Sequence, residues 1–407
     1  GSWVGLGSRL AWQRASGPVP PRSRRQVGFP RTQRSMRFLR VPSVLVACLS
    51  ATARAVPASL PKDFLDWATE HGKEYLTDSE WEKALAAYVE NTEIIRELNA
   101  MQDGAEYGHT RFSDLTGTEF QKKQFPAKRM DPDAAKAGGK LPEPMGPPPV
   151  SFDWRSSGAV TPVKDQSSCG SCWAESAVEN METAWYLANK KTLSAPVPLS
   201  VQEIIECDAY ADACYGGFPK DAYRYVIKAG GMASEAEYPY VVNGKTICLA
   251  NQTFNDTCGD GICDDPPLTS WCDLTCSSKK HKNTAHISSW TALPTDEDQL
   301  ASYLAEHGPI SVGIDASGKW GLLFPWLQFY KRGIANPKRC TTTNIDHAVL
   351  LVGFGEESGT KYWIVKNSWG AKWGEAGYFR LQRGESKCGI NQMATTSIVG
   401  QEDLLVI

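Results

Sequence analysis

The chain has 407 residues, with 43 Lys and Arg against 46 Asp and Glu, so its formal net charge is −3. A content of 42% hydrophobic and 22% charged residues is typical of globular proteins and excludes a disordered, collagenous or coiled-coil chain. Nine Arg and no acidic residue fall within residues 1–40, so the remaining chain is acidic, which argues against a general nucleic-acid binder. No run of eighteen apolar residues occurs, so no transmembrane helix is expected.

Residues 36–55 have the pattern of a secretory signal peptide. Met36 is followed by two Arg, a short apolar run over residues 41–50 and a small-x-small site that ends at Ala55. We expect cleavage after Ala55, with residues 1–35 a disordered leader or not native to the protein. A rival interpretation is an Arg-rich organelle transit peptide that starts at residue 1. The signal peptide predicts the secretory pathway, with a lysosome, a vacuole or the extracellular space as the destination.

The chain contains twelve Cys, and eleven remain once a signal peptide that includes Cys48 is removed. In an oxidising compartment an odd number leaves one thiol unpaired. That thiol is a candidate for chemistry.

The segment after the signal peptide predicts an amphipathic helix. Thr77 and Glu80 have the spacing of a capping box. Apolar side chains then recur on one helix face at Trp81, Leu85, Tyr88, Ile95 and Leu98. Taken alone, this is a surface helix that packs on a partner. Residues 125–150 are rich in Pro, Ala and Gly, so we expect an exposed linker that is open to cleavage.

Residues 166–174 read Gln-Ser-Ser-Cys-Gly-Ser-Cys-Trp-Ala, and Cys172 lies where this loop meets a helical run without Pro or Gly. A helix N-terminus offers free N–H groups and a partial positive charge, which favour a thiolate over a thiol. Because the thiolate is the nucleophilic form of Cys, we predict that Cys172 is the unpaired, reactive thiol.

A Cys nucleophile needs a base and a group that orients the base. Six His are present, and His347 differs from the others because it leads directly into an apolar run that predicts a strand. Asn367 follows a second predicted strand, residues 362–365, and begins the sequence Asn-Ser-Trp-Gly. A single His or Asn beside a strand is more often structural than catalytic, so the prediction depends on finding the Gln, Cys, His and Asn motifs together and in this order.

These motifs resemble those of the papain-like cysteine proteases, in particular zymogens of the cathepsin L type. Residues 169–173 match the family signature Cys-Gly-Ser-Cys-Trp. Two further patterns resemble its inhibitory propeptides of the I29 type: Glu80, Tyr88, Asn91, Ile95 and Asn99, and then Gly108, Thr110, Phe112 and Asp114. Ala84 and Tyr88 depart from that pattern, since the family has Arg and Phe at these positions.

The resemblance implies an α+β, two-lobed papain-like fold preceded by a helical propeptide. A helical left lobe is expected over about residues 150–245 and a β-barrel-like right lobe over about residues 280–398, with the cleft between them. We expect the inhibitory propeptide and its linker at residues 56–147 and the peptidase domain at residues 148–407. The propeptide would lie in the cleft and block it until it is removed.

The resemblance also implies the catalytic roles. Cys172 is the nucleophile, paired as a thiolate with protonated His347, which then protonates the leaving amine. Asn367 orients His347, and Trp369 shields the hydrogen bond between them. The side chain of Gln166 and the backbone N–H of Cys172 form the oxyanion hole.

The substrate cleft is carried over in the same way. Gly216 and Gly217 would pair with the backbone of an extended substrate. The second specificity pocket would be lined by Phe218, Pro219, Gly313, Ile345, Ala348 and Met393. These residues are apolar or small, so the expected substrate has a bulky apolar side chain one residue before the scissile position and accepts Arg there poorly.

Three disulfides follow from the resemblance: Cys169–Cys214, Cys340–Cys388, and Cys207 with either Cys248 or Cys276, of which Cys276 is preferred. A Cys-rich insertion spans about residues 242–276. Its cysteines could bind zinc, but disulfides are expected in a secreted chain. Asn251 and Asn255 begin N-glycosylation sequons, which favours an exposed loop.

The insertion is similar in position to the occluding loop of cathepsin B-like members, which act as carboxydipeptidases through a His-His pair. No adjacent His pair occurs in this insertion. An endopeptidase is therefore the leading interpretation, and a carboxydipeptidase is the alternative.

Glu175 departs from the family pattern, which has an aromatic or aliphatic residue at this position. An unpaired Glu is costly to bury. Three interpretations stay open: Glu175 meets a cation or solvent and does little, it retunes the Cys172–His347 pair, or it marks an inactive papain-fold binding protein. A Cys-rich adhesion module, supported by the insertion alone, is another non-enzyme alternative.

The enzyme interpretation implies polypeptide substrates, the chain's own propeptide as an intramolecular inhibitor, and cystatin-like inhibitors as partners. It involves no cofactor and no metal. We expect no nucleic-acid or membrane partner, and a monomer.

Overall fold

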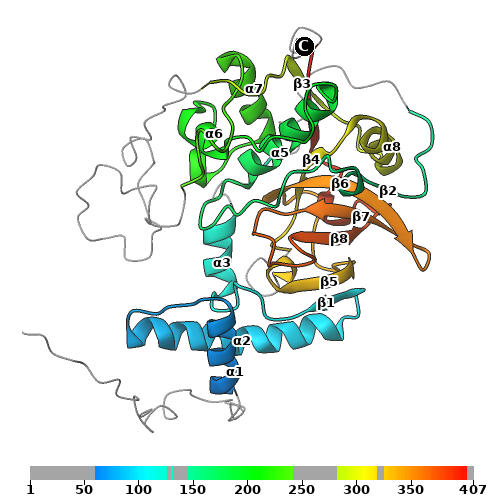
Figure 1. Ribbon diagram of the computed structural model, residues 1–407. Helices are drawn as coiled ribbons and strands as arrows, with labels where there is room; N and C mark the ends of the chain where they lie inside the picture. Colours follow the sequence, from blue (N-terminus) through cyan, green and yellow to red (C-terminus); the bar gives the residue numbers. More distant parts are fainter. Residues whose placement is uncertain (1–59, 126–129, 132–144, 242–281, 319–324, 401–407) are drawn as a thin grey trace, which may run out of the picture. The chain divides into compact units, whose positions relative to one another are not determined.

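A computed structural model describes residues 60–125, 130–131, 145–241, 282–318 and 325–400 (Figure 1). All of them belong to one unit, Val56–Ile407. The predicted leader, signal peptide, glycosylation sequons and Cys-rich insertion lie outside the described residues. Among the described helices, none combines the length and the apolar character needed to cross a bilayer.

The predicted propeptide begins with two helices, α1 (Leu60–Glu70) and α2 (Asp78–Ala100). The predicted capping box is present, because the Thr77 hydroxyl accepts the Glu80 N–H and the Glu80 carboxylate accepts the Thr77 N–H, both at 3.1 Å. A small aromatic core joins the two helices and consists of Phe64, Trp67, Ala68, Ala84 and Tyr88. Ala84, where the family has Arg, is therefore a packing residue here.

Two Asn side chains of α2 hold the chain that follows it. The Asn91 amide donates to the backbone oxygens of Ser113 at 2.9 Å and Leu115 at 2.8 Å. Asn99 exchanges two hydrogen bonds with the backbone of Tyr107. These contacts fix strand β1 (Ala105–Tyr107) and lead into helix α3 (Gly117–Gln124). The polar positions of the propeptide pattern thus serve as backbone anchors.

A helical lobe is formed by α5 (Cys172–Ala188), α6 (Val201–Cys207) and α7 (Pro219–Ala229). The first twelve residues of α5 are all buried, because α6 and α7 pack on one side of the helix and the sheet lies on the other (Figure 1). The helix therefore carries its polar side chains into the protein interior.

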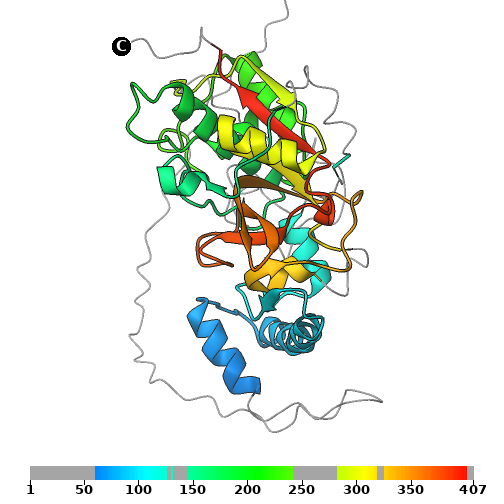
Figure 2. The same cartoon turned by 90° about the vertical axis from the view of Figure 1, so that its right-hand side faces the viewer.

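The described strands form a sheet in the order β1-β5-β8-β7-β6-β4-β9-β3, with β2 paired to β6. All neighbouring strands are antiparallel except β5 and β8. The strands are β2 (Phe152–Asp153), β3 (Ser289–Ala292), β4 (Ile310–Ile314), β5 (Tyr330–Ala335), β6 (His347–Glu357), β7 (Thr360–Lys366), β8 (Tyr378–Gln382) and β9 (Ala394–Ile398). Helix α8 (Glu297–His307) packs against β6 and lies in front of the strands in Figure 2. Short 3-10 turns cover Trp154–Ser157, Ala213–Tyr215, Trp326–Phe329 and Lys387–Gly389.

The helical lobe and the sheet have separate apolar cores. The helical core is built around Trp173, Met181, Trp185 and Tyr223, and the sheet core around residues such as Phe329, Leu351 and Trp363. The predicted two-lobed α+β fold is therefore confirmed. The sheet core also contains Phe112, Phe120 and Phe125 of the predicted propeptide, so this segment is packed as part of the unit.

Two of the predicted disulfides are present, Cys169–Cys214 and Cys340–Cys388. Cys207 is also disulfide-bonded, but both cysteines considered as its partner lie outside the described residues. Among the described cysteines, Cys172 is the free one, as predicted.

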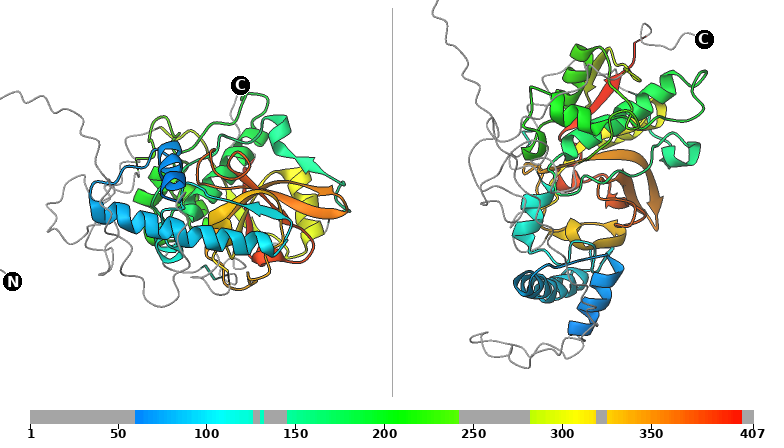
Figure 3. Two further views of the ribbon diagram at one scale, coloured as in Figure 1. Left: turned by 90° about the horizontal axis from the view of Figure 1, so that it is seen from below. Right: turned by 60° about the vertical axis from the view of Figure 1, so that its left-hand side comes forward.

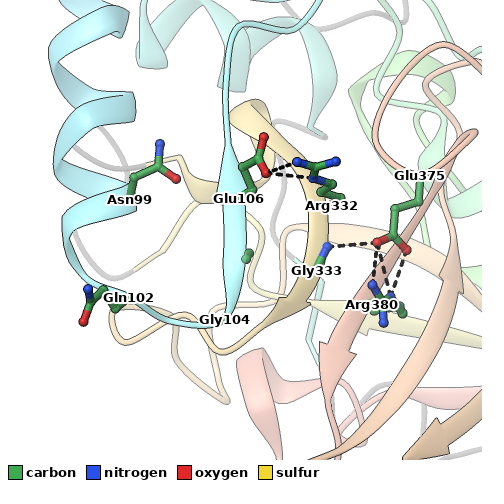
Figure 4. A pocket seen from close by; sticks show the side chains of 9 residues that line it. Asn99, Gln102, Gly104, Glu106, Arg332, Gly333, Glu375 and Arg380 are labelled. Carbon is green, nitrogen blue, oxygen red and sulfur yellow. Dashed lines mark hydrogen bonds and ion pairs between the residues drawn. The ribbon is translucent and has the colours of Figure 1, made fainter. Parts of the chain in front are cut away.

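The predicted propeptide extends the edge of the sheet. Strand β1 pairs antiparallel with β5, and Glu106 lies opposite Arg332, with its carboxylate 2.6 Å from the guanidinium. Figure 3 shows α2 on the same side of the molecule as these two strands. A pocket beside them is lined by the Arg332 and Glu375 side chains, and the Glu375 carboxylate binds Arg380 and accepts the Gly333 N–H (Figure 4). This pocket belongs to the strand junction and does not include Cys172.

Replacing Gly104 with Ala should loosen this junction. Gly104 has φ +93°, and a Cβ there would lie 2.5 Å from the Ile334 carbonyl oxygen of β5. Because strained backbone and a lost strand contact cost about 2 kcal/mol, we expect Gly104→Ala to lower the melting temperature of the intact chain by about 5 °C. The matched control is Gly72→Ala, where φ is +61° but no atom lies within 4 Å of the added Cβ. Equal losses in the two variants would contradict a specific contact at Gly104.

Candidate active site

Cys172 is the first residue of α5 and is fully buried. Its sulfur accepts backbone N–H groups from Trp173 in the same helix turn and from Ala348 in β6. The second contact comes from the opposite lobe, since Ala348 directly follows His347. The fold therefore brings the predicted nucleophile to the start of the strand that carries the predicted base.

His347 begins β6, and its side chain is held by Asn367 and Trp369, which follow strand β7. Its Nε2 lies 2.8 Å from Oδ1 of Asn367, which follows β7 directly. The Trp369 ring stacks on the imidazole, with centroids 5.0 Å apart and planes inclined by 22°. Because Nε2 donates to the Asn oxygen, Nδ1 is the free basic nitrogen, and it is buried without a partner among the described residues. The sequence-predicted His, Asn and Trp are thus brought together.

Gln166 is held by three contacts. Its Oε1 accepts the Ser368 hydroxyl at 2.6 Å, and its amide donates to the Cys169 carbonyl at 2.7 Å. The amide also donates at 2.9 Å to the carbonyl of Gln124, the last residue of α3. A propeptide carbonyl therefore occupies a donor that the sequence assigns to the oxyanion hole.

The predicted propeptide covers both candidate catalytic side chains. The Phe125 ring lies 5.3 Å from the His347 ring, on a tilted plane. Met130 donates its backbone N–H to the Ile345 carbonyl at 2.9 Å and packs in one apolar cluster with Cys172. Phe125 and Met130 are only 5% and 2% exposed, so the expectation of an exposed linker over residues 125–150 is wrong at these positions. At the far end of that range, Val150 is exposed as expected.

Burial changes the charge state of the pair in this form. The loss of solvent raises the pKa of the Cys172 thiol to about 12, although the two backbone N–H groups oppose the rise. Burial also lowers the pKa of His347 to about 4, against the hydrogen bond to Asn367. In this buried form, desolvation therefore opposes the thiolate that the helix N-terminus favours, and it favours a neutral thiol and a neutral imidazole.

Most residues of the predicted specificity pocket lie close together. Phe218, Ile345, Ala348 and Met393 belong to the apolar cluster that contains Cys172 and Met130. Gly313 lies beside them, and a Cβ there would come within 2.5 Å of Ile345 and 2.6 Å of Met393, so glycine allows these two side chains to pack closely against the strand. Pro219 is buried as the first residue of α7 and directly follows Phe218.

The two predicted glycines lie on the α5 side of the site. Gly216 has φ +132° and ends the 3-10 turn before α7. A Cβ on Gly217 would lie 2.7 Å from the Trp173 ring, so only glycine fits against this side chain.

The other described His residues lie away from Cys172. His71 and His109 belong to the predicted propeptide, His286 contacts Trp185, and His307 contacts Tyr303 on α8. His281 lies outside the described residues. No cluster of three or more His, Cys, Asp or Glu in the described part of the chain could hold a metal ion.

The sequence prediction missed three contributors to the site. The Ser368 hydroxyl donates to Gln166. Its position inside the motif Asn-Ser-Trp-Gly was the sequence feature that could have indicated this role. Phe125 and Met130 were missed because the Pro, Ala and Gly around them indicated a linker. Each is a large apolar residue in that polar and Pro-rich surrounding, which was the only clue to burial.

Comparison with known proteins agrees with this geometry. Residues 148–398 match the family described as papain family cysteine protease, and residues 64–120 match the cathepsin propeptide inhibitor domain (I29). The chain belongs to the papain family of cysteine proteases. The predicted family resemblance, with its propeptide, is thus confirmed.

Among curated relatives, mouse cathepsin F is 36% identical over 340 residues, which cover 83% of this chain and 64% of that protein. Cysteine proteinase 15A of Pisum sativum is 34% identical and covers 84% of this chain and 87% of its own length. Among solved structures, a digestive procathepsin L2 from the larval midgut of Tenebrio molitor is 29% identical, with a TM-score of 0.66 over 84% of this chain and 100% of its own. A recombinant stem bromelain precursor is 30% identical, with a TM-score of 0.64 over 84% and 99%. The similarity to precursor structures extends over the propeptide and the peptidase fold together.

Removing the Met130 side chain should uncover Cys172. We expect Met130→Ala to readmit water and lower the pKa of the thiol, and each unit of that fall raises the thiolate fraction about tenfold. The measurement is the rate at which iodoacetamide labels Cys172 in the uncleaved chain at pH 7, followed by mass spectrometry. Met145→Ala is the control, because Met145 bonds Gln299 of α8 through its backbone. Equal labelling rates in the two variants would contradict the role of Met130.

Proposed function

We propose that the protein is the zymogen of a cysteine endopeptidase that cleaves peptide bonds through Cys172 and His347. The main support is the buried His347–Asn367 hydrogen bond of 2.8 Å beside the free thiol of Cys172. The orienting oxygen leaves one imidazole nitrogen available for proton transfer, which is the arrangement that activates a Cys nucleophile. The I29-type propeptide supports the inactive precursor form.

The proposed reaction starts when the propeptide leaves and water re-enters the site. Cys172 then transfers its proton to His347, and the sulfur electron pair attacks the peptide carbonyl carbon. The carbonyl oxygen takes up the displaced electron pair and is stabilised by the Gln166 amide, freed from Gln124, and by the Cys172 N–H. His347 gives its proton to the leaving amine as the C–N bond breaks. Water then attacks the thioester with His347 as base and releases the acid and the thiol.

The apolar cluster supports a preference for large apolar side chains. Met130 shares one apolar cluster with Ile345, Ala348 and Met393, which supports a preference for apolar side chains at this position. The four predicted pocket residues in this cluster are Phe218, Ile345, Ala348 and Met393, and none of them is charged. An Arg side chain there would lose its hydration without gaining a partner.

A carboxydipeptidase is the second candidate, because the Cys-rich insertion at about residues 242–276 is similar in position to an occluding loop. The sequence of the insertion contains no adjacent His pair, which favours the endopeptidase. Cystatin-like inhibitors would compete for the same cleft.

Recombinant zymogen provides the direct test. After acid treatment, we expect cleavage inside an internally quenched peptide that carries Leu one residue before the scissile position, and at least tenfold slower cleavage with Arg there. Cys172→Ala should abolish turnover without lowering the melting temperature, because the thiol makes no covalent bond in the fold. Turnover by Cys172→Ala would refute the assignment. Release of C-terminal dipeptides without internal cleavage would establish the carboxydipeptidase instead.

The predicted signal peptide and the cathepsin and plant relatives support passage through the secretory pathway, to a lysosome, a vacuole or the extracellular space. Acidification in such a pathway would give the propeptide a signal for release.

His109 is suited to respond to that signal. Its ring stacks on Tyr88 with centroids 3.9 Å apart, and its Nε2 lies 3.1 Å from the Thr92 hydroxyl oxygen. The Thr92 hydroxyl donates to the Tyr88 carbonyl at 2.9 Å, so it accepts the His109 N–H. Nδ1 is buried without a partner among the described residues. Burial lowers the pKa of His109 to about 4, and the charges of Lys331 in β5 and of His71 add to this.

His109 should therefore weaken the propeptide as the pH falls. Its pKa is lowered from 6.5 to about 4 in the folded zymogen, so the fold disfavours the protonated imidazole. Above pH 6.5 this has no effect on the free energy of unfolding. As the pH falls towards 4, the free energy of unfolding decreases by about 3 kcal/mol. His109→Gln keeps an N–H for Thr92 but cannot take up the proton. We expect the pH of half-maximal maturation, measured on gels, to fall by about one unit. His307→Gln, at an exposed position on α8, is the control. Unchanged maturation of His109→Gln would assign the response to another group.

A further inference from the structure

Helix α5 carries three carboxylic side chains into the interior of the protein, on Glu175, Glu179 and Glu182. Glu179 forms an ion pair of 2.7 Å with Lys366 of β7, and Glu182 forms one of 3.0 Å with Lys164. All five residues are largely or fully buried, with side-chain exposure of at most 13% for the lysines. Each buried ammonium group therefore already has a carboxylate of its own.

Glu175 is the third of these carboxyls and, unlike the other two, forms no ion pair among the described residues. It is 1% exposed, and its Oε2 has no hydrogen-bond partner among the described residues. The groups that act on it are the cation of Lys164, the carboxyls of Glu179, Glu182 and Glu235, the hydroxyl of Tyr240 and the thiol of Cys172. The Tyr240 hydroxyl is engaged with Ser171 and with the Gln166 carbonyl. Glu182 and Glu179 already form ion pairs with Lys164 and Lys366. A negative charge on Glu175 would therefore have no lysine of its own.

A buried carboxyl with no counter-charge is stable only when it keeps its proton. Burial raises the pKa of Glu175 well above its usual value, and the neighbouring carboxyls raise it further, while Lys164 opposes the rise. Glu175 lies three residues after Cys172, one turn along the same helix. A negative charge on Glu175 disfavours the Cys172 thiolate and raises the pKa of that thiol.

We propose that Glu175 is a neutral carboxylic acid in the working enzyme, and that its ionisation at rising pH switches off Cys172. The proposal rests on the proposed function, since it assigns regulation to the same nucleophile. Glu175 touches neither the substrate nor the leaving group. It acts only through Cys172, as a positioning residue whose proton keeps a repelling charge away from the sulfur.

The proton also links Glu175 to stability. In the unfolded chain the carboxyl ionises near pH 4.5, whereas in the fold it ionises at a higher pH. The folded state therefore binds the proton more tightly, and stability falls as the pH rises from about 4.5 through the folded pKa.

The test compares Glu175→Gln with Glu179→Gln, the same substitution one helix turn away. Glu175→Gln keeps the shape of the acid without its charge, so the alkaline limb of kcat/KM should move up by at least one pH unit. The ratio of kcat/KM at pH 7.5 to that at pH 5 should rise about tenfold. In zymogens that also carry Cys172→Ala, the melting temperature of Glu175→Gln should rise relative to that of the parent between pH 5 and pH 8. Glu179→Gln should lower the melting temperature at both pH values, because it leaves Lys366 unpaired.

Two results would overturn the proposal. One is an alkaline limb that is the same in Glu175→Gln as in the parent enzyme, and the other is a lower melting temperature of Glu175→Gln at pH 8, which would mean that Glu175 is ionised and paired. Glu175→Met, which needs no hydrogen-bond partner, repeats both measurements if the Gln variant does not fold. Absence of any turnover dependent on Cys172 in the parent enzyme would refute the proposed function instead, and the melting comparison would still decide the charge state of Glu175.

Discussion

Exclusion of water from the contact between Cys172 and the start of β6 is the constraint on which the rest of the site depends. A thiolate and an imidazolium attract each other, but each loses its hydration when it is buried, and burial dominates here. Phe125 and Met130 supply that burial from the propeptide. Desolvation therefore disfavours an ion pair between Cys172 and His347 in this form, while Asn367 and Trp369 hold the imidazole in place.

The propeptide achieves this by joining the packing of the enzyme instead of lying loosely on it. Phe112 and Phe120 stand edge-on to Trp369, the same ring that stacks on His347. Strand β1 completes the sheet edge at β5, and Asn91 and Asn99 fix the chain between these points. The contacts are spread over a strand, an aromatic cluster and a backbone bond at Met130, so the propeptide is attached at several separate points.

Much of this could be predicted from local sequence. The capping box at Thr77, the start of α5 at Cys172 and the strand position of His347 are set by neighbours within a few residues, and the family motifs ordered the site. Phe125 and Met130 could not be predicted, because their burial depends largely on distant parts of the chain, including His347 and Ile345, which lie more than 200 residues away. Glu175 shows the same limit. Its sequence departure was visible, but its lack of a counter-charge depends on how Lys164 and Lys366 are shared among α5 carboxyls.

Burial moves the two unusual titratable groups in opposite directions, yet with one effect. His109 is basic, so burial lowers its pKa and its proton is costly in the zymogen. Glu175 is acidic, so burial raises its pKa and its charge is costly in the enzyme. Low pH is therefore proposed to destabilise the bound propeptide and to keep Glu175 uncharged beside Cys172. Higher pH would stabilise the bound propeptide and would place a negative charge near the thiol. If both proposals hold, a desolvated base in the propeptide and a desolvated acid one helix turn from Cys172 would together favour maturation and activity at acid pH.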